Sequence, residues 1–110
     1  MKKDKTGYIY TQVVLRDEEG NVITDDYGRP VMDYIPNIPF IIRSWQPYSP
    51  QMASDRYAIR VPEVNYRFFS DPDDRLDFKV RFSFRGNDYR IEYPLKYERH
   101  YEILITELKK

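Results

Sequence analysis

Hydrophobic and polar positions alternate along several short stretches of this chain, which is the pattern of half-buried β-strands. The clearest stretch is FKVRFSFRGNDYRIEY, residues 78–93, where aromatic and aliphatic residues alternate with charged or small ones on both sides of a Gly-Asn pair. Two alternating runs around such a pair predict a β-hairpin.

Other alternating segments predict more strands. YIYTQVVLR, residues 8–16, places Ile9, Val13 and Leu15 on one face, and strands are also expected at FIIRSW, VNYRFF and the closing HYEILITEL. The polar DEEGN sequence reads as a turn, after which VIT could return as a short strand. No helix of three turns is visible in the sequence. Five to seven short antiparallel strands predict an all-β fold, a compact barrel or sandwich, in a single domain spanning residues 1–110.

Glycine and proline interrupt the segment between residues 25 and 39. Gly28, Pro30, Pro36 and Pro39 fall within it. Proline removes a backbone donor and is tolerated in a sheet mainly at its edge, so this segment is predicted to be either an irregular excursion or an edge.

A second interruption separates the strand that ends at Trp45 from the one that begins at Val64. It spans about 18 residues, longer than most structureless connections in compact domains, and such connections are usually functional. Ser49 followed by Pro50 is a good N-cap and first-turn pair, which predicts one or two helical turns up to about Tyr57. Tyr57, Ile59 and Val61 then alternate with polar neighbours, which indicates an extended arm. We expect a projecting loop over about residues 47–62 that packs against something.

Composition narrows the possible functions. The chain has 18 basic and 18 acidic residues and no cysteine, so a non-specific nucleic-acid binder is disfavoured and disulfides and thiolate sites are excluded. Eleven tyrosines and six phenylalanines favour strands and protein–protein contacts. No apolar segment is long enough to span a bilayer, and MKKDKTG is not followed by an apolar signal region. We therefore expect a soluble chain that its own sequence does not export.

The candidates for chemistry are weak. His100 is the only histidine and has no nearby hydroxyl or metal-ligand spacing, so no catalytic residue is expected. The SDPDDRLD stretch clusters four aspartates that resemble calcium ligands, but the spacing differs from the helix–loop–helix pattern, and aspartate with proline builds turns without a metal. Neither a metal nor a cofactor is expected.

Four cations define one further candidate, a face for single-stranded nucleic acid on an oligonucleotide-binding barrel. In such a platform the aromatics lie beside the cations, whereas here they alternate to the opposite side. An ordinary solvated face of a sheet is therefore the favoured interpretation. The cations are Arg67, Lys79, Arg81 and Arg90.

The order and spacing of several weak motifs resemble a known family. WQPYSPQ at residues 45–51, YRFFSDPDDRLDFKVRFSFRGNDYRI at 66–91 and the HYEILITEL ending are similar to the head-completion, or stopper, proteins of long-tailed bacteriophages. The similarity covers about residues 40–108 and, more loosely, the strand at residues 8–16. Trp45 departs from the family pattern, where a smaller aliphatic residue is expected.

The resemblance implies a non-enzymatic structural protein of the phage neck. Such proteins are small β-barrels that form a homo-oligomeric ring below the portal and adaptor, close the DNA exit channel and present the surface on which the tail docks. The implied partners are portal–adaptor (head–tail connector) proteins, tail proteins and packaged double-stranded DNA, with no membrane and no small-molecule substrate. The implied locations are the virion neck and, during assembly, the host cytoplasm.

Mapped onto this sequence, the resemblance implies roles for two sets of residues. The loop that closes the channel would carry Tyr48, Gln51, Met52, Asp55, Arg56, Tyr57, Ile59 and Arg60. Contacts to subunits or partners would include Trp45, Tyr34 and Phe69.

Two alternatives stay open at this point. One is a tail completion or terminator protein of the same particle, which would contact the tail tube instead of the capsid connector. The other is the single-stranded nucleic-acid-binding barrel, for which steeply salt-dependent oligonucleotide binding would be evidence.

Overall fold

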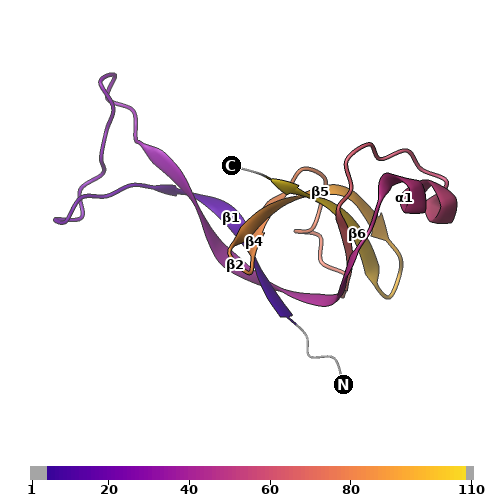
Figure 1. Cartoon of the computed structure of the whole chain (residues 1–110). Coiled ribbons are helices and arrows are strands. Elements are labelled where there is room, and N and C mark those ends of the chain that lie inside the picture. Colours follow the sequence, from indigo (N-terminus) through magenta and orange to yellow (C-terminus); the bar gives the residue numbers. More distant parts are fainter. Residues whose placement is uncertain (1–4, 109–110) are drawn as a thin grey trace.

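The computed structural model describes residues 5–108, and in this range the chain forms one closed antiparallel barrel with a single helix (Figure 1). The elements are β1 (Lys5–Val14), β2 (Met32–Pro47), α1 (Pro50–Tyr57), β3 (Tyr66–Ser70), β4 (Arg81–Phe84), β5 (Asn87–Lys96) and β6 (Tyr101–Leu108). Neighbouring strands pair in the order β1-β2-β3-β6-β5-β4, and β4 closes on β1. The predicted small all-β barrel is confirmed.

Aromatic side chains fill the barrel. Phe68 and Phe82 are completely buried, and the Phe40 ring meets Phe82 edge-on with 5.2 Å between centroids. Aliphatic residues of β5 and β6, among them Ile91 and Ile103, complete this interior. Such packing makes the barrel a self-contained core, because burial of large apolar side chains is the main favourable term in folding.

A β-bulge in β2 turns Trp45 toward this interior. Arg43 pairs with Phe69 and Gln46 pairs with Arg67, so Ser44 and Trp45 together oppose Phe68. Ser44 takes a positive φ of 53° to make this possible. The Trp45 ring then lies 4.5 Å from Phe84 and 5.0 Å from Tyr66 between centroids. A bulge is a common device for re-aiming one side chain of a strand.

The predicted hairpin is present as β4 and β5. Its two-residue turn consists of Arg85 and Gly86, both with positive φ, between the paired residues Phe84 and Asn87. This is the turn geometry that two-residue hairpins prefer.

The predicted start of this hairpin at residue 78 was wrong. Lys79 adopts a positive φ of 67°, and the strand begins only at Arg81. Phe78 is 54% exposed and packs on Tyr93, outside the barrel.

The proline-rich segment divides at Met32. Residues 25–31 form a turn outside the named strands, with an isolated bridge at Pro30, and the remainder belongs to β2, the longest strand. β2 runs through Pro36 and Pro39 while pairing with β1, and it pairs with β3 only from Arg43 onward. The other side of β2 is therefore an open edge where the prolines lie, which fits the edge alternative. The VIT segment contributes only isolated bridges at Val22 and Thr24.

Beyond Ile9, where β1 last pairs with β4, the β1–β2 ribbon leaves the barrel. We call residues 10–38 the arm. In Figure 1 the arm extends to the left, away from the barrel, while α1 lies at the opposite end. The extents of the molecule are 53 × 32 × 26 Å, and the arm accounts for the long dimension.

Candidate functional site

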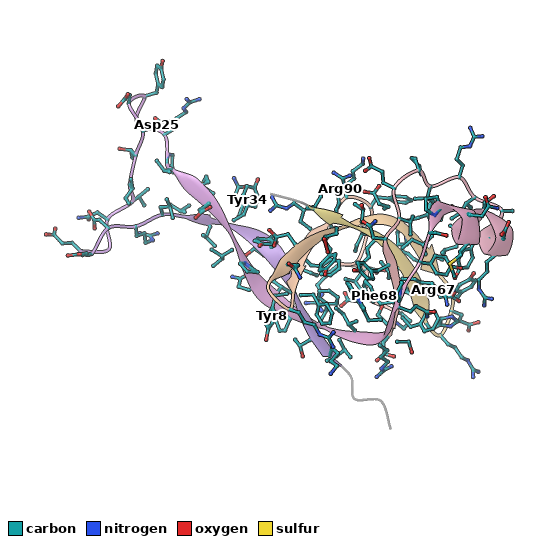
Figure 2. The ribbon with its side chains drawn as sticks, viewed as in Figure 1. Tyr8, Asp25, Tyr34, Arg67, Phe68 and Arg90 are labelled. Carbon is teal, nitrogen blue, oxygen red and sulfur yellow. The ribbon has the colours of Figure 1, made fainter. Side chains whose placement is uncertain are left out.

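Exposed apolar side chains collect on the arm. Seven of the twelve large hydrophobic residues that are exposed in the described chain lie between residues 10 and 38, and Figure 2 shows the arm's side chains standing apart from the packed barrel. Exposed apolar groups gathered on one element mark an interaction surface more often than scattered ones do. The seven are Val14, Val22, Ile23, Tyr27, Met32, Tyr34 and Ile35.

Two turns of the same design form the end of the arm. The Asp17 carboxylate accepts backbone hydrogen bonds from Glu19 and Asn21 at 3.0 and 2.9 Å. Eight residues later, Asp25 does the same for Tyr27 and Arg29 at 2.8 and 3.0 Å. Glycine with positive φ follows three residues after each aspartate, where the chain turns back. The sequence therefore contains an eight-residue repeat, DEEGNVIT followed by DDYGRPVM, which the strand-by-strand interpretation missed.

A cyclic set of backbone hydrogen bonds joins both turns to the ribbon. Leu15 N donates to Val31 O, Val31 N donates to Ile23 O, and Ile23 N donates to Leu15 O, each at 2.9 to 3.0 Å. These three residues are spaced eight apart and flank the two turn segments. The arm thus ends in a three-way backbone junction with two leaves, residues 16–22 and 24–30.

The predicted helix is confirmed where the sequence signals placed it. α1 spans Pro50–Tyr57, Ser49 is its N-cap and accepts a hydrogen bond from Met52 N at 3.2 Å, and Ala58 ends it with a left-handed φ of 56°. One side of the helix rests on the barrel, because Ala53 is fully buried. Its cluster also contains Tyr48, Val61, Val64 and Leu104. The segment from 47 to 62 therefore packs against its own barrel, and the arm is the part that reaches furthest from it.

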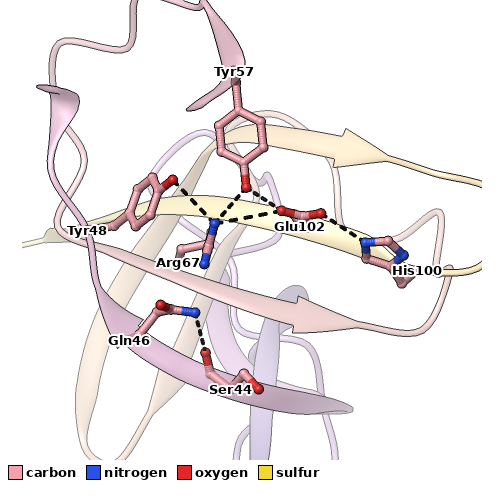
Figure 3. A network of polar contacts seen from close by, with 7 residues as sticks. All are labelled: Ser44, Gln46, Tyr48, Tyr57, Arg67, His100 and Glu102. Carbon is pink, nitrogen blue, oxygen red and sulfur yellow. Dashed lines mark hydrogen bonds and ion pairs between the residues drawn. The ribbon is translucent and has the colours of Figure 1, made fainter. Parts of the chain in front are cut away.

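A buried polar network holds α1 to the barrel wall (Figure 3). The Arg67 guanidinium, on β3, donates to the hydroxyl of Tyr57 at 2.8 Å and of Tyr48 at 3.3 Å, and its Nη1 lies 3.8 Å from a carboxylate oxygen of Glu102 on β6. Tyr57 in turn donates to Glu102, whose other oxygen lies 2.9 Å from His100 Nε2. A buried ion pair supports the fold only while both partners remain charged.

The pKa shifts in this network follow from its contacts. Burial, then the hydrogen bond to Glu102, raises the pKa of Tyr57 to about 12. Burial alone would raise the pKa of Glu102, but hydrogen bonds from Tyr57 and His100 and the charge of Arg67 hold it below its ordinary value. At neutral pH the site therefore holds a neutral tyrosine between a cation and an anion.

An open cleft lies between α1 and the end of β2. Its volume is about 530 Å³, and Gln46, Tyr48, Met52, Asp55, Arg56 and Arg67 line it. The Arg67 guanidinium forms its floor, with the Tyr48 ring 4.5 Å and the Phe69 ring 4.9 Å from its central carbon. Arg67 Nε is buried and has no hydrogen-bond partner among the described residues.

The residues expected in a channel-closing loop divide between the surface of the barrel and the solvent. Tyr48 is buried, and Tyr57 and Ile59 are partly buried against the barrel. The others are exposed on α1 or just after it: Gln51, Met52, Asp55, Arg56 and Arg60. The prediction of an extended segment over residues 57–61 was wrong, because Tyr57 ends the helix and the residues after it form no strand.

The three expected contact residues lie in different environments. Tyr34 is 56% exposed on the arm. Trp45 packs against the barrel core instead of facing outward. Phe69 is partly buried between the Arg67 guanidinium and the His100 ring. Of the three, only Tyr34 presents most of its side chain to a partner.

The four cations expected on one solvated face do not share one environment. Arg67 is only 8% exposed, because α1 covers that part of the sheet. Arg81 lies over the Tyr10 ring at 4.8 Å, and Arg90 pairs with Glu92 at 2.8 Å. The buried position of Arg67 corrects the interpretation as a uniformly solvated face. The sequence signal for it was the pair of tyrosines that precede it, Tyr48 just before α1 and Tyr57 at its end, whose hydroxyls need a polar partner when buried.

The aspartate-rich segment is a turn, as the sequence predicted. Asp73 accepts from the backbone N of Arg75 at 3.0 Å and forms an ion pair with its guanidinium at 2.6 Å, which lowers the pKa of Asp73. Within residues 5–108 no group of three or more histidine, cysteine, aspartate or glutamate side chains could hold a metal ion. The same part of the chain has no helix that is long and apolar enough to cross a membrane.

Comparisons with known proteins add no relative. No protein-family model matches the chain, and a search of curated proteins finds no match.

Proposed function

We propose that this chain is a structural protein of a bacteriophage neck, a head-completion protein that forms a ring below the portal and adaptor. The observation that supports this function best is the difference in burial between the side chains of the barrel and those of the arm. The barrel buries its own aromatics, while the arm exposes seven large apolar side chains that its own chain does not cover. A protein built in this way gains from assembly, since only a partner can bury such a surface.

The absence of recognisable chemistry in the described residues is compatible with a non-enzymatic role. The cleft beside α1 holds two arginines and one aspartate but no pair of groups placed as nucleophile and base. Sequence motifs similar to stopper proteins supply the specific assignment to the neck.

The first experiment is to purify DNA-filled and unfilled heads from the phage that encodes this chain. The protein should co-purify with the portal–adaptor complex on filled heads and be missing from unfilled ones. Its presence on isolated tails instead would make it a tail completion protein, and its absence from both would contradict the proposal.

A second experiment tests the channel-closing role of the segment that carries α1. Deletion of residues 51–60 should leave a folded barrel, because the aromatic core lies elsewhere, but filled heads should lose their DNA. Heads that retain DNA with the deleted protein would contradict this role.

A further inference from the structure

We propose that the arm of one copy of this chain docks in the cleft beside α1 of the next copy. There a carboxylate of the arm binds the Nε side of the Arg67 guanidinium, whose Nε has no hydrogen-bond partner among the described residues. This inference rests on the proposed ring and specifies the contact that would build it. This contact involves only residues of this chain and needs no other protein.

The first support is the unused bonding capacity of Arg67. All its hydrogen bonds and its ion pair come from Nη1, while Nε is buried without a partner. A planar guanidinium grips a carboxylate with two parallel hydrogen bonds, from Nε and the outer amino group. Gln46 lies below this part of the guanidinium in Figure 3, and its amide is held only by a 3.4 Å contact with Ser44 O. Since Nε is buried, a ligand would reach this edge only when neighbouring side chains such as Gln46 move.

The second support is charge. Residues 15–31 contain five acidic residues and two arginines, so the rest of this neutral chain holds thirteen acidic and sixteen basic residues. The arm is thus the acidic part of the molecule. The cleft is lined by Arg56 and Arg67 against one carboxylate, Asp55, which already accepts a hydrogen bond from Gln51 at 2.9 Å. Complementary potentials favour a correctly oriented encounter.

The third support distinguishes the two leaves of the arm. Asp25 of the second leaf is paired with Arg29 at 3.2 Å. In the first leaf, Glu18 and Glu19 have exposed side chains and no ion pair among the described residues, and Asp17 holds the turn. In the second leaf Asp26 alone is exposed without an ion pair among the described residues, so the first leaf presents two available carboxylates and the second presents one.

The fourth support is position. In Figure 1 the arm and α1 lie at opposite ends of the molecule, and residues of α1 line the cleft. A contact between two different patches is heterologous, and when its rotation closes it produces a ring. Two other clefts suit an acidic leaf less well. One is lined by Asp71, Asp73 and a single cation, Arg75, which pairs with Asp73, and the other is lined by Glu63 and Glu107 without a cation.

The lack of cysteine in the chain makes a direct test possible. We would mix a tagged Glu19→Cys variant with an untagged Met52→Cys variant, oxidise at the highest soluble concentration, and look for the mixed disulfide on a non-reducing gel. Met52 is exposed and lines the cleft. The matched control pairs Glu19→Cys with Thr6→Cys in the cleft that Asp71 and Asp73 line. Cross-linking traps even a brief contact, so a monomeric protein is not an obstacle.

A mixed dimer that forms with Met52→Cys and not with Thr6→Cys supports the proposal. Adding Glu18→Lys and Asp26→Lys to the arm variant should then lower its yield about tenfold, since like charges would meet, and Arg56→Glu in the partner should restore it. No mixed dimer, or equal yields with both cleft variants, would overturn the proposal. The head purification described above is independent of this result. A failed cross-link would leave the neck assignment standing, and absence of the protein from heads would leave a positive cross-link standing.

Discussion

The barrel and the arm are continuous through the same two strands, yet they are stabilised in different ways. In the barrel, side chains make the structure: Phe68 and Phe82 are completely buried among other rings. In the arm, the backbone makes it, through the ladder of β1 and β2 and the junction of Leu15, Ile23 and Val31. Seven large apolar side chains of the arm are exposed and therefore available to a partner. Substitutions in the two regions should therefore differ sharply in their effect on stability.

The largest effect is expected inside the barrel. Phe68→Ala removes a fully buried ring that touches Phe40, Trp45 and Phe82. It should lower the free energy of unfolding by about 3–5 kcal/mol, as large-to-small core substitutions do. Urea denaturation measures this, with Phe68→Leu as a milder control. A loss below about 1 kcal/mol would contradict the described core.

The next effect concerns the ion pair that holds α1. Glu102→Gln leaves the buried Arg67 without its anion and should cost about 3 kcal/mol near neutral pH. Because the pKa of Glu102 is lowered in the folded state, its contribution is present above the ordinary carboxylate pKa and is lost as pH falls through the folded value. The acid branch of stability against pH should therefore flatten in the variant. Asp77→Asn, which breaks the exposed pair with Lys96, is the control and should change little.

A smaller effect is expected at the hydroxyl between the two charges. Tyr57→Phe removes the donor to Glu102 and the acceptor for Arg67, and should cost about 1–2 kcal/mol. The raised pKa of about 12 means that the neutral phenol is favoured on folding. The wild-type protein should therefore lose stability as pH rises from about 10 toward 12. Chemical denaturation between pH 8 and pH 11 should show a weaker decline for the variant, and parallel curves would contradict the assignment.

Removing the helix cap should have a modest effect. Ser49→Ala leaves Met52 N without its acceptor and should cost about 1 kcal/mol, whereas Ser49→Asp should retain most of the stability. Thermal melting of the two variants gives the comparison. Equal melting temperatures would mean that the cap does not stabilise α1.

The smallest effect is expected on the arm. Tyr34→Ser combined with Ile35→Ser removes two exposed apolar side chains and should change the free energy of unfolding by less than about 0.5 kcal/mol. If assembly depends on the arm, the same variant should be lost from filled heads. A large loss of stability would show that the arm's apolar side chains support the fold itself.

The sequence predicted the parts of this structure that local rules control. Alternation on both sides of the predicted Gly-Asn turn located the β4–β5 hairpin, although its turn residues are Arg85 and Gly86, and Ser49 with Pro50 located α1. It did not predict the arm, because prolines at positions 36 and 39 resemble an interruption until the open edge of β2 is known. Nor did it predict the buried Arg67, since alternation assigns a residue to a face but does not say which loop covers that face. Those features depend on contacts distant in sequence.

The three-way junction has a consequence for how this molecule can vary. Each leaf begins and ends at the junction, and the carboxylates of Asp17 and Asp25 hold the turns from within. The side chains at the tips, such as those of Glu18 and Tyr27, are therefore not needed to hold the backbone of the turns. They can be exchanged without shifting the strand register of the barrel. Related chains could bind different partners through substitutions at a few tip positions. The same leaves could also display a chosen peptide loop in a designed protein.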